Sequence, residues 1–272
     1  MALKRAGHKV DGYNRSETPV KFALEHKIID GVAKDFAEYD VIFAALPPKP
    51  TVDFILGTHF KSGAVVADIC GVKEYVENAV NSAKPDIKYV GTHPMAGKEV
   101  SGVENACADL FDSASMVITR GALTDEKAVL IIKSLTKNMG FKRIVECSAA
   151  VHDRKIAYTS QLAHVVSNSY VNDREIDGCL GFTGGSFQDM TRIAGVDENV
   201  WAELYLDNAD NLLSSVKNLH GSLGKFISVL ENARADCDSS ALKEYLSVGA
   251  RAYRNGKANN FTGDGITVTE LK

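Results

Sequence analysis

The sequence has 272 residues, of which 45% are hydrophobic and 24% charged, and its formal net charge is −4. This composition is typical of a globular protein, and the weak negative charge argues against binding to nucleic acid or anionic lipid. No run of apolar residues is long enough to span a membrane, and the N-terminus lacks the apolar stretch of a signal peptide. The 5 cysteines show no CxxC spacing, so we expect a reduced cytoplasmic protein with neither a disulfide framework nor a metal site.

Up to about Cys147, short apolar runs alternate with segments of helical pattern. We expect strands over residues 8–14, 39–46, 63–69, 87–93, 113–120 and 142–147. We expect helices over residues 19–27, 50–58, 73–83 and 124–140, while residues 2–7 read as the last turns of a helix. Strands that alternate with helices predict a doubly wound, mostly parallel α/β sheet, and the nearly all-apolar strands indicate that both faces are covered.

The strand signals stop after Cys147, so the sequence predicts a dinucleotide-binding domain over residues 1–147 and an all-helical domain over residues 148–272. Residues 148–171 read as one long helix. A later segment has apolar residues at alternating steps of three and four, a heptad-like seam, at Ala209, Leu212, Val216, Leu219, Leu223, Phe226 and Leu230. Such a helix most often packs within its own domain; the alternative is that it also pairs with a second subunit, giving a homodimer.

The beginning of the expected sheet is incomplete. The glycine-rich turn GxGxxG is absent, and the end of a helix stands where the first strand is expected. We expect that Met1 is an internal methionine of a longer product, so that the first strand is missing; a naturally shortened sheet is the alternative. Asn14, Arg15 and Ser16 occupy the place where an acidic residue would hold a ribose 2′-hydroxyl, and they suit a 2′-phosphate, which favours NADP over NAD. A plain turn with a solvated arginine explains this stretch equally well.

The segment GTHPMAG, residues 91–97, places His93 at the carboxyl end of an expected strand. In open α/β sheets, ligands bind at that edge. Pro94 biases the backbone of His93 toward extended geometry, and the small residues Ala96 and Gly97 leave room for a ring-sized ligand. A lone histidine is more often structural than catalytic, but its position at the end of a strand favours a catalytic role.

Further candidate residues lie in the helical half. His164 follows Ser160 by four residues and so shares its helical face. Arg192 follows the flexible pair at residues 184–185, and Trp201 is the only tryptophan. Taken singly, these residues are better explained as a core histidine, a surface arginine and a buried tryptophan.

Together, these segments resemble the prephenate dehydrogenase family, which also includes arogenate dehydrogenases. The matching stretches are VADICGVK (66–73), GTHPMAGKEVSGVENA (91–106), HDRKIAYTSQLAH (152–164) and GGSFQDMTRIAG (184–195), with Trp201 downstream. The resemblance implies oxidative decarboxylation of prephenate to 4-hydroxyphenylpyruvate with hydride transfer to NADP or NAD, a step of tyrosine biosynthesis.

The resemblance also implies roles for individual residues. His93 would be the catalytic histidine that takes the proton of the substrate hydroxyl, and Arg192 would hold a substrate carboxylate. The other implied substrate-binding residues are Ser160, His164, Gly185, Trp201 and Gly71. The implied cofactor-binding residues are Asn14, Arg15, Ser16, Leu46, Pro47 and Asp68.

The sequence departs from the family pattern at a few positions. Gly71 replaces a serine whose hydroxyl helps to hold the reacting alcohol, and Gln161 and Ala163 replace the His and Pro of a common Ser-His-Leu-Pro-His run. Because these changes bear on substrate choice, arogenate dehydrogenase remains an alternative. A β-hydroxyacid-type dehydrogenase with a catalytic lysine in the helical half is a more distant one. A non-catalytic dimeric scaffold that binds no cofactor is the alternative from another class of protein.

Overall fold

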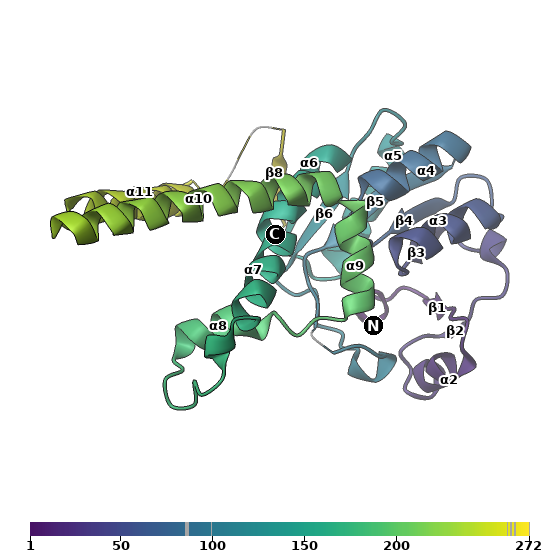
Figure 1. The fold of residues 1–272 in the computed structure, drawn as a ribbon. Helices are drawn as coiled ribbons and strands as arrows, with labels where there is room; N and C mark the ends of the chain where they lie inside the picture. The colour runs from purple at the N-terminus through teal and green to yellow at the C-terminus, as the bar shows by residue number, and fades with distance from the viewer. Residues whose placement is uncertain (85–86, 99, 260, 262, 264, 272) are drawn as a thin grey trace. The chain divides into compact units, whose positions relative to one another are not determined.

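The computed structural model describes residues 1–84, 87–98, 100–259, 261, 263 and 265–271 (Figure 1). The chain forms two compact units, of which the first comprises Met1–Asp153, Val196–Asp207 and Thr267–Lys272. The second comprises Arg154–Gly195 and Asn208–Ile266. This division differs from the single boundary at Cys147 that the sequence predicts, because two later segments of the chain pack with the sheet-containing unit.

The first unit contains all the strands of the described residues. They are β1 (Asp11–Gly12), β2 (Gly31–Val32), β3 (Val41–Ala44), β4 (Val65–Asp68), β5 (Lys88–Pro94), β6 (Ser115–Thr119), β7 (Arg143–Cys147) and β8 (Thr267–Glu270). Strands β1 and β2 form a parallel 2-stranded sheet, and the rest form a 6-stranded sheet in chain order.

Most neighbouring strands of the larger sheet are parallel. Strands β3, β4 and β5 run parallel, as do β6 and β7, whereas β5 with β6 and β7 with β8 are antiparallel. The predicted mostly parallel sheet is therefore confirmed. The expectation that strands end at Cys147 is wrong for β8, whose four residues are all exposed and carry no apolar run that would mark them as a strand.

Helices cover both faces of the larger sheet. The helices of this unit are α1 (Ala2–Arg5), α2 (Glu17–Glu25), α3 (Pro48–Gly57), α4 (Glu74–Ala83), α5 (Glu126–Asn138) and α9 (Glu198–Asp207), with single 3₁₀ turns at Phe36–Glu38 and Val103–Asn105. Alternate residues of β4 point to opposite faces. Val65 and Ala67 share a core with residues of α1 and α5, while Val66 shares a core with residues of α3 and α4, which lie side by side in Figure 1. These layers hold the carboxyl ends of the strands in fixed positions.

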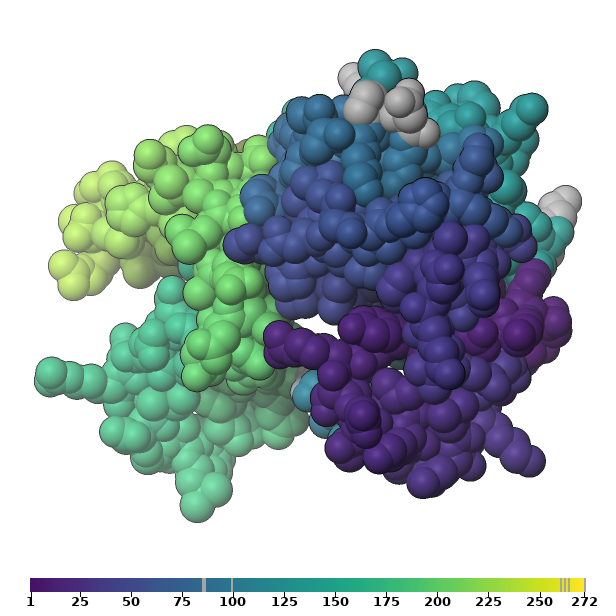
Figure 2. Space-filling model, turned by 90° about the vertical axis from the view of Figure 1, so that its right-hand side faces the viewer, coloured from purple at the N-terminus to yellow at the C-terminus, as the bar shows by residue number. Residues whose placement is uncertain are grey.

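The N-terminal segment is less deeply packed than the larger sheet. Among the residues that the structure describes, strands β1 and β2 pair only with each other, and residues 13–18 between β1 and the body of α2 are exposed. Figure 2 shows the N-terminal segment, in purple, at the surface of the molecule. The carboxyl end of β1 is therefore accessible to solvent.

The second unit is helical. It contains α7 (Leu162–Val171), α8 (Gly185–Arg192), α10 (Ala209–Asp236) and α11 (Ser240–Ala258), with a 3₁₀ turn at Arg174–Ile176. Helix α6 (Ala149–Ile156) continues through a π-helical segment, Ala157–Gln161, into α7, so the predicted long helix over 148–171 is confirmed.

The predicted heptad-like segment is also a helix. Helix α10 is 28 residues long, and α11 lies beside it, with the Tyr245 hydroxyl donating to the Ser222 carbonyl oxygen over 3.2 Å (Figure 1). Leu212 of the seam is buried, whereas Leu223 and Leu230 are exposed. Within the described residues, no helix is both long enough and apolar enough to cross a membrane.

Candidate active site

His93 lies at the carboxyl end of β5, beyond the last residue that pairs with β4. The β4 ladder ends where Asp68 faces Gly91, and β5 continues through Thr92, His93 and Pro94 along β6. The side chain of His93 therefore emerges at the edge where ligands bind in open α/β sheets. His93 is partly exposed, so a ligand can reach it.

A second histidine lies directly behind His93. The Nδ1 atom of His93 is 2.9 Å from Nε2 of His152, and the two rings meet at an interplanar angle of 61°. The Nδ1 atom of His152 is 2.6 Å from the Oδ1 atom of Asp153. A hydrogen-bonded chain thus runs from the carboxylate through both imidazole rings.

The carboxylate of Asp153 caps the N-terminus of helix α4. Its Oδ1 accepts from the backbone N–H of Lys73 over 2.8 Å, and its Oδ2 accepts from that of Glu74 over 2.9 Å. The first N–H groups of a helix lack intrahelical partners and carry the positive end of the helix dipole. Asp153, which is buried, therefore satisfies two of these N–H groups.

A buried ion pair braces the same region. The Nζ atom of Lys73 contacts the carboxylate of Asp68 and donates to the carbonyl oxygen of Thr92 over 2.6 Å, and both charged side chains are 0% exposed. The Tyr89 hydroxyl and the backbone N–H of Cys70 also donate to the Asp68 carboxylate, over 2.7 and 2.9 Å. Because Thr92 precedes His93, this network fixes the end of β5 that carries the imidazole.

The environment keeps His93 neutral. Burial, followed by the nearby His152 and Lys73, lowers the pKa of His93 from 6.5 to about 3. Burial also lowers the pKa of His152, against the opposing effect of Asp153. A neutral imidazole has one ring nitrogen with a free lone pair, so His93 is in the protonation state that a general base needs.

The residues assigned to the cofactor lie at the carboxyl ends of successive strands. Asn14, Arg15 and Ser16 follow β1 and are exposed, with the Ser16 N–H donating to the Asn14 Oδ1 over 3.1 Å. Leu46 and Pro47 follow β3, and Leu46 is exposed although it is apolar. Arg15 thus presents an exposed cation after β1, and Leu46 presents an exposed apolar side chain after β3.

Asp68 behaves differently from these residues. It was assigned to the cofactor from the sequence, but it is fully buried and its oxygens are taken up by Lys73, Tyr89 and Cys70. The structure therefore gives Asp68 an internal role in bracing the carboxyl ends of β4 and β5. Within the described residues, no group of three or more His, Cys, Asp or Glu side chains could hold a metal ion.

The residues assigned to the substrate are divided between the compact units. His93, Gly71 and Trp201 belong to the first unit, and Ser160, His164, Gly185 and Arg192 belong to the second. Trp201 lies on α9, with its ring 5.6 Å from that of Tyr205. Gly71 lies between β4 and α4, and a Cβ atom there would be 3.5 Å from the side chain of Leu204.

Hydrogen bonds in the second unit connect helices α7 and α8. The Nδ1 atom of His164 is 2.7 Å from the carbonyl oxygen of Ile193, and the Ser167 hydroxyl donates to the carbonyl oxygen of Met190 over 2.6 Å. A carbonyl only accepts, so Nδ1 of His164 carries a proton. The structure thus brings His164 next to the end of α8, where Arg192 lies.

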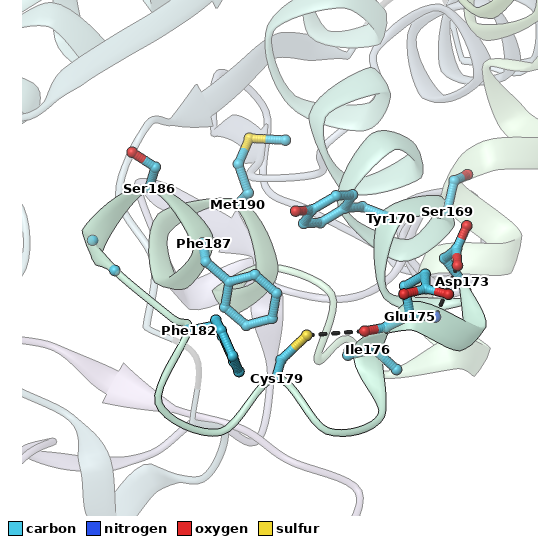
Figure 3. A pocket seen from close by; sticks show the side chains of 12 residues that line it. Ser169, Tyr170, Asp173, Glu175, Ile176, Cys179, Phe182, Ser186, Phe187 and Met190 are labelled. Atoms are coloured by element: carbon cyan, nitrogen blue, oxygen red, sulfur yellow. Dashed lines mark hydrogen bonds between the residues drawn. The ribbon is translucent and has the colours of Figure 1, made fainter.

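Gly185 borders a cavity of about 780 Å³ in the second unit (Figure 3). Tyr170 and Phe187 face each other there with ring centroids 6.0 Å apart, and the Cys179 thiol donates to the Glu175 carbonyl oxygen over 2.9 Å. The complete lining is Ser169, Tyr170, Asp173, Glu175, Ile176, Cys179, Phe182, Gly184, Gly185, Ser186, Phe187 and Met190. The cavity has aromatic walls and room for a ring-sized ligand.

His152, Asp153 and Lys73 are not among the site residues that the sequence predicts. His152 and Asp153 stand at the start of the matching stretch 152–164, so an adjacent His–Asp pair was visible. The contact of this pair with His93 could not be predicted, because His93 is 59 residues away from His152 in the chain. A buried lysine cannot be recognised from its own position, since lysines are almost never fully buried unless paired.

Comparison with known proteins extends over both halves of the chain. Residues 1–145 match the family model "prephenate dehydrogenase, nucleotide-binding domain", and residues 148–247 match "prephenate dehydrogenase, dimerization domain". The chain is 28% identical over 271 residues to prephenate dehydrogenase of Bacillus subtilis, a match that covers 94% of this chain and 71% of that protein. It is 26% identical over 237 residues to cyclohexadienyl dehydrogenase of Zymomonas mobilis, covering 84% of this chain and 79% of that one.

A solved structure is similar over nearly the whole length. It is prephenate dehydrogenase from A. aeolicus in complex with hydroxyphenyl propionate and NAD+, with a TM-score of 0.79 and 25% identity. The match covers 93% of this chain and 92% of that one. A nucleotide-binding sheet with a neutral imidazole at its carboxyl edge, followed by a helical unit, defines an oxidoreductase that uses NAD(P). The chain belongs to the prephenate dehydrogenase family.

Proposed function

We propose that this chain catalyses the NAD(P)-dependent oxidative decarboxylation of prephenate to 4-hydroxyphenylpyruvate, with His93 as the general base. The setting of His93 is the main support. Its imidazole is neutral, lies at the ligand-binding edge of the sheet, and is held from behind through Nδ1, which leaves Nε2 for a substrate hydroxyl. A positioned base typically contributes about 10²–10⁴-fold to a rate.

The protein's part in the reaction is to handle one proton and to orient the ring. When bound, NAD(P) supplies the acceptor for the hydride that leaves C4 of the substrate. His93 takes the proton of the C4 hydroxyl at Nε2 as the C4–O double bond forms. The carboxylate on C1 leaves as carbon dioxide, and its bonding electrons complete the aromatic ring. His93 then returns the proton to the oxygen on C4, so that a phenol results and the base is restored.

The remaining substrate residues have proposed roles that follow from their chemistry. Arg192 holds a substrate carboxylate, because a guanidinium matches that group with two parallel hydrogen bonds. Ser160 and His164 bind polar groups of the substrate, and the contact between Nδ1 of His164 and the Ile193 carbonyl oxygen fixes the orientation of that ring. Gly185 allows a close approach of the backbone, and Trp201 lines the substrate pocket.

The same ring chemistry would operate on arogenate, which carries an amino acid in place of the pyruvyl side chain. Similarity to a protein named cyclohexadienyl dehydrogenase keeps this second candidate open. His93 and Arg192 would serve both substrates, so neither residue separates them. Comparing kcat/KM for prephenate and arogenate, each with NAD and with NADP, identifies the preferred pair.

We further propose that the chain acts in the cytoplasm as a homodimer formed through its helical half. The match of residues 148–247 to a dimerization domain supports this assembly. The exposed side of α10 supports it too, because Leu223 and Leu230 of the seam and the nearby Ile227 are exposed although they are apolar. Pairing with a second copy would remove these side chains from water.

The test of the reaction is spectrophotometric. Adding prephenate and NADP or NAD to the protein should raise the absorbance of the reduced nicotinamide. His93→Asn should lower kcat by roughly 10²–10⁴-fold without changing the melting temperature. His59→Asn, at an exposed histidine in the loop after α3, is the matched control and should retain full activity.

Cofactor titration separates an enzyme from a scaffold. Saturating NADP or NAD should raise the free energy of unfolding by roughly 2.7 kcal/mol at a concentration of 100 Kd. No change in melting temperature at millimolar concentrations of either cofactor would favour the scaffold. Full turnover by the His93→Asn variant would remove His93 from its proposed role.

A further inference from the structure

We infer that His152 and Asp153 are positioning residues that fix His93 in the tautomer required of a base and stabilise the imidazolium that forms when it takes the substrate proton. The inference rests on the proposed role of His93. It deepens that role by identifying a buried relay, His93–His152–Asp153, whose bonds all lie within the first compact unit.

The direction of each hydrogen bond in the relay follows from the Asp153 carboxylate, which can accept a hydrogen bond but cannot donate one. An ionised carboxylate only accepts, so the 2.6 Å contact requires that Nδ1 of His152 carry a proton and donate it to Asp153. A neutral imidazole has one proton, so Nε2 of His152 is then an acceptor. The 2.9 Å contact between the rings therefore requires that Nδ1 of His93 donate to it. The lone pair of His93 is left on Nε2, which does not take part in the relay.

The opposite arrangement needs a charged His152. A doubly protonated His152 would donate to His93 and would force the proton of His93 onto Nε2, the wrong tautomer for a base. His152 is buried, and burial lowers the pKa of its imidazole. The neutral form of His152, and with it the productive tautomer of His93, is therefore favoured.

Asp153 is built into the structure so that it can anchor the relay. It accepts the backbone N–H groups of Lys73 and Glu74 at the start of α4, while its Oδ1 also faces His152. These bonds fix the position of the carboxylate. A carboxylate that caps a helix is fixed in position, so the imidazole N–H that donates to it is held in one orientation. In this way Asp153 orients His152, and His152 orients His93.

The charges near the relay show why a second negative group is needed. Lys73 lies close enough to disfavour protonation of His93, and its own positive charge is balanced by Asp68. The cation that forms on His93 during turnover lies near Lys73, so it needs a further counter-charge. Asp153, reached through His152, is that counter-charge. A carboxylate behind a catalytic imidazole acts in this way in other enzymes, by orienting the ring and stabilising its cation.

Two substitutions at the same position test the relay. His152→Asn places an amide where Nδ1 stands, so it retains a donor for Asp153 but removes the acceptor for His93. His152→Gln reaches the place of Nε2 and retains that acceptor. We expect His152→Asn to lower kcat by roughly 10²-fold with KM for substrate and cofactor changed by less than about threefold, because a misplaced proton costs most of the contribution of a base. His152→Gln should retain about ten times more activity than His152→Asn.

Ring-nitrogen NMR of histidine-labelled protein gives the readout that a merely structural role would not change. In the unmodified protein, Nδ1 of His93 should be protonated and Nε2 should be free. In His152→Asn, the proton of His93 should move to Nε2, and in His152→Gln it should return to Nδ1. Asp153→Asn is the second variant if His152→Asn does not fold, and it should shift the tautomer of His93 in the same direction.

Two results overturn the inference. One is a His152→Asn protein that keeps both the Nδ1-protonated His93 and a kcat within about twofold of the original. The other is a loss of activity shared equally by the Asn and Gln variants, with KM raised and the His93 tautomer unchanged, since that would be loss of packing. Failure of the proposed function is distinguishable, because His93→Asn would then remain active while the NMR tautomer would still report on the relay.

Discussion

Charged side chains are buried in the first compact unit, whereas large apolar side chains are exposed in the second. The interior of the first unit holds three charged side chains, those of Lys73, Asp68 and Asp153. The Lys73 side chain pairs with Asp68, and the Lys73 backbone N–H donates to Asp153. In the second unit, Leu180 is 96% exposed and Phe182 is 90% exposed, and apolar side chains also face outward along α10. The first unit thus buries several charged side chains, whereas the second unit exposes large apolar side chains to solvent.

This difference indicates what each unit needs in order to be stable. The first unit covers both faces of its sheet and supplies partners for its buried charges, so it can hold a base in place by itself. Exposed apolar surface of the kind seen in the second unit usually marks a place where something else binds. We therefore expect substitutions to disturb folding in the first unit and assembly in the second.

The largest expected effect comes from breaking the buried ion pair. Lys73→Met leaves the Asp68 carboxylate buried without its cation, which should lower the free energy of unfolding by about 3–5 kcal/mol. Lys49→Met is the control, since the Lys49–Asp53 pair has side chains that are 72% and 64% exposed, so that solvent screens the pair and its loss should change the free energy of unfolding far less. Urea unfolding measures both. Equal losses for the two variants would mean that burial does not distinguish these ion pairs.

The second effect is a dependence of stability on pH that arises in the first unit. Burial lowers the pKa of His93 to about 3, so between about pH 6.5 and 3 His93 binds more protons in the unfolded chain than in the folded one, and the lowered pKa of His152 acts in the same direction. The free energy of unfolding should therefore fall as the pH drops through this window, by up to about 1.4 kcal/mol per pH unit for each histidine. The fall should be absent above about pH 7.

Urea unfolding at several pH values between 7 and 5 isolates the histidines, because most carboxyl groups titrate at lower pH. The His93→Asn variant should show a shallower dependence than the unmodified protein. His59→Asn, at an exposed position, should leave the dependence unchanged. A His93→Asn protein with the original slope would show that His93 is not the group responsible.

The third effect concerns assembly through the second unit. Ile227→Glu changes a side chain that is 55% exposed in the single chain, so it should alter monomer stability by no more than about 0.5 kcal/mol. If α10 pairs with a second copy, the new charge is buried in the interface and dimer affinity should fall by roughly 10²-fold or more. Light scattering over a range of concentrations measures this. Asn218→Glu, also on α10, is a matched control away from the apolar seam.

The sequence predicts most of the elements that build the first unit, and the reasons are physical. Buried strands such as β4 are continuous apolar runs between glycine and polar residues, and a strand covered on both faces must have that pattern. Strand β8 lacks the pattern because all of its residues are exposed, and its existence depends on pairing with β7. A contact between segments so far apart in the chain leaves no periodic signal.

The candidate site is only partly visible in the sequence for a related reason. His93 could be found because Pro94 and the end of a strand mark its position. The partners of His93 could not be found in this way, because His152 lies on α6 and comes next to His93 only in the folded chain. Asp68 illustrates the reverse case, since its place at the end of β4 is typical of a ligand-binding residue, yet its carboxylate is used inside the protein.

The smallest expected effect is a gain of activity at Gly71. This glycine does not adopt a left-handed backbone, and an added Cβ atom would meet Leu204 at 3.5 Å, which is an ordinary van der Waals contact. A serine can therefore be introduced without strain. If the reacting alcohol lies near this residue, the new hydroxyl should add one hydrogen bond worth about 0.5–1.5 kcal/mol and raise kcat/KM roughly two- to tenfold.

Gly71→Ala separates the hydroxyl from the added bulk, because it supplies the same Cβ atom without a donor. Steady-state kinetics with prephenate should show a gain for Gly71→Ser and none for Gly71→Ala. Equal values for the two variants would mean that no substrate oxygen lies within reach of this position. Because the serine is introduced beside the relay rather than in it, a gain should leave the pH dependence of stability unchanged, which ties the effect to the substrate and not to His93.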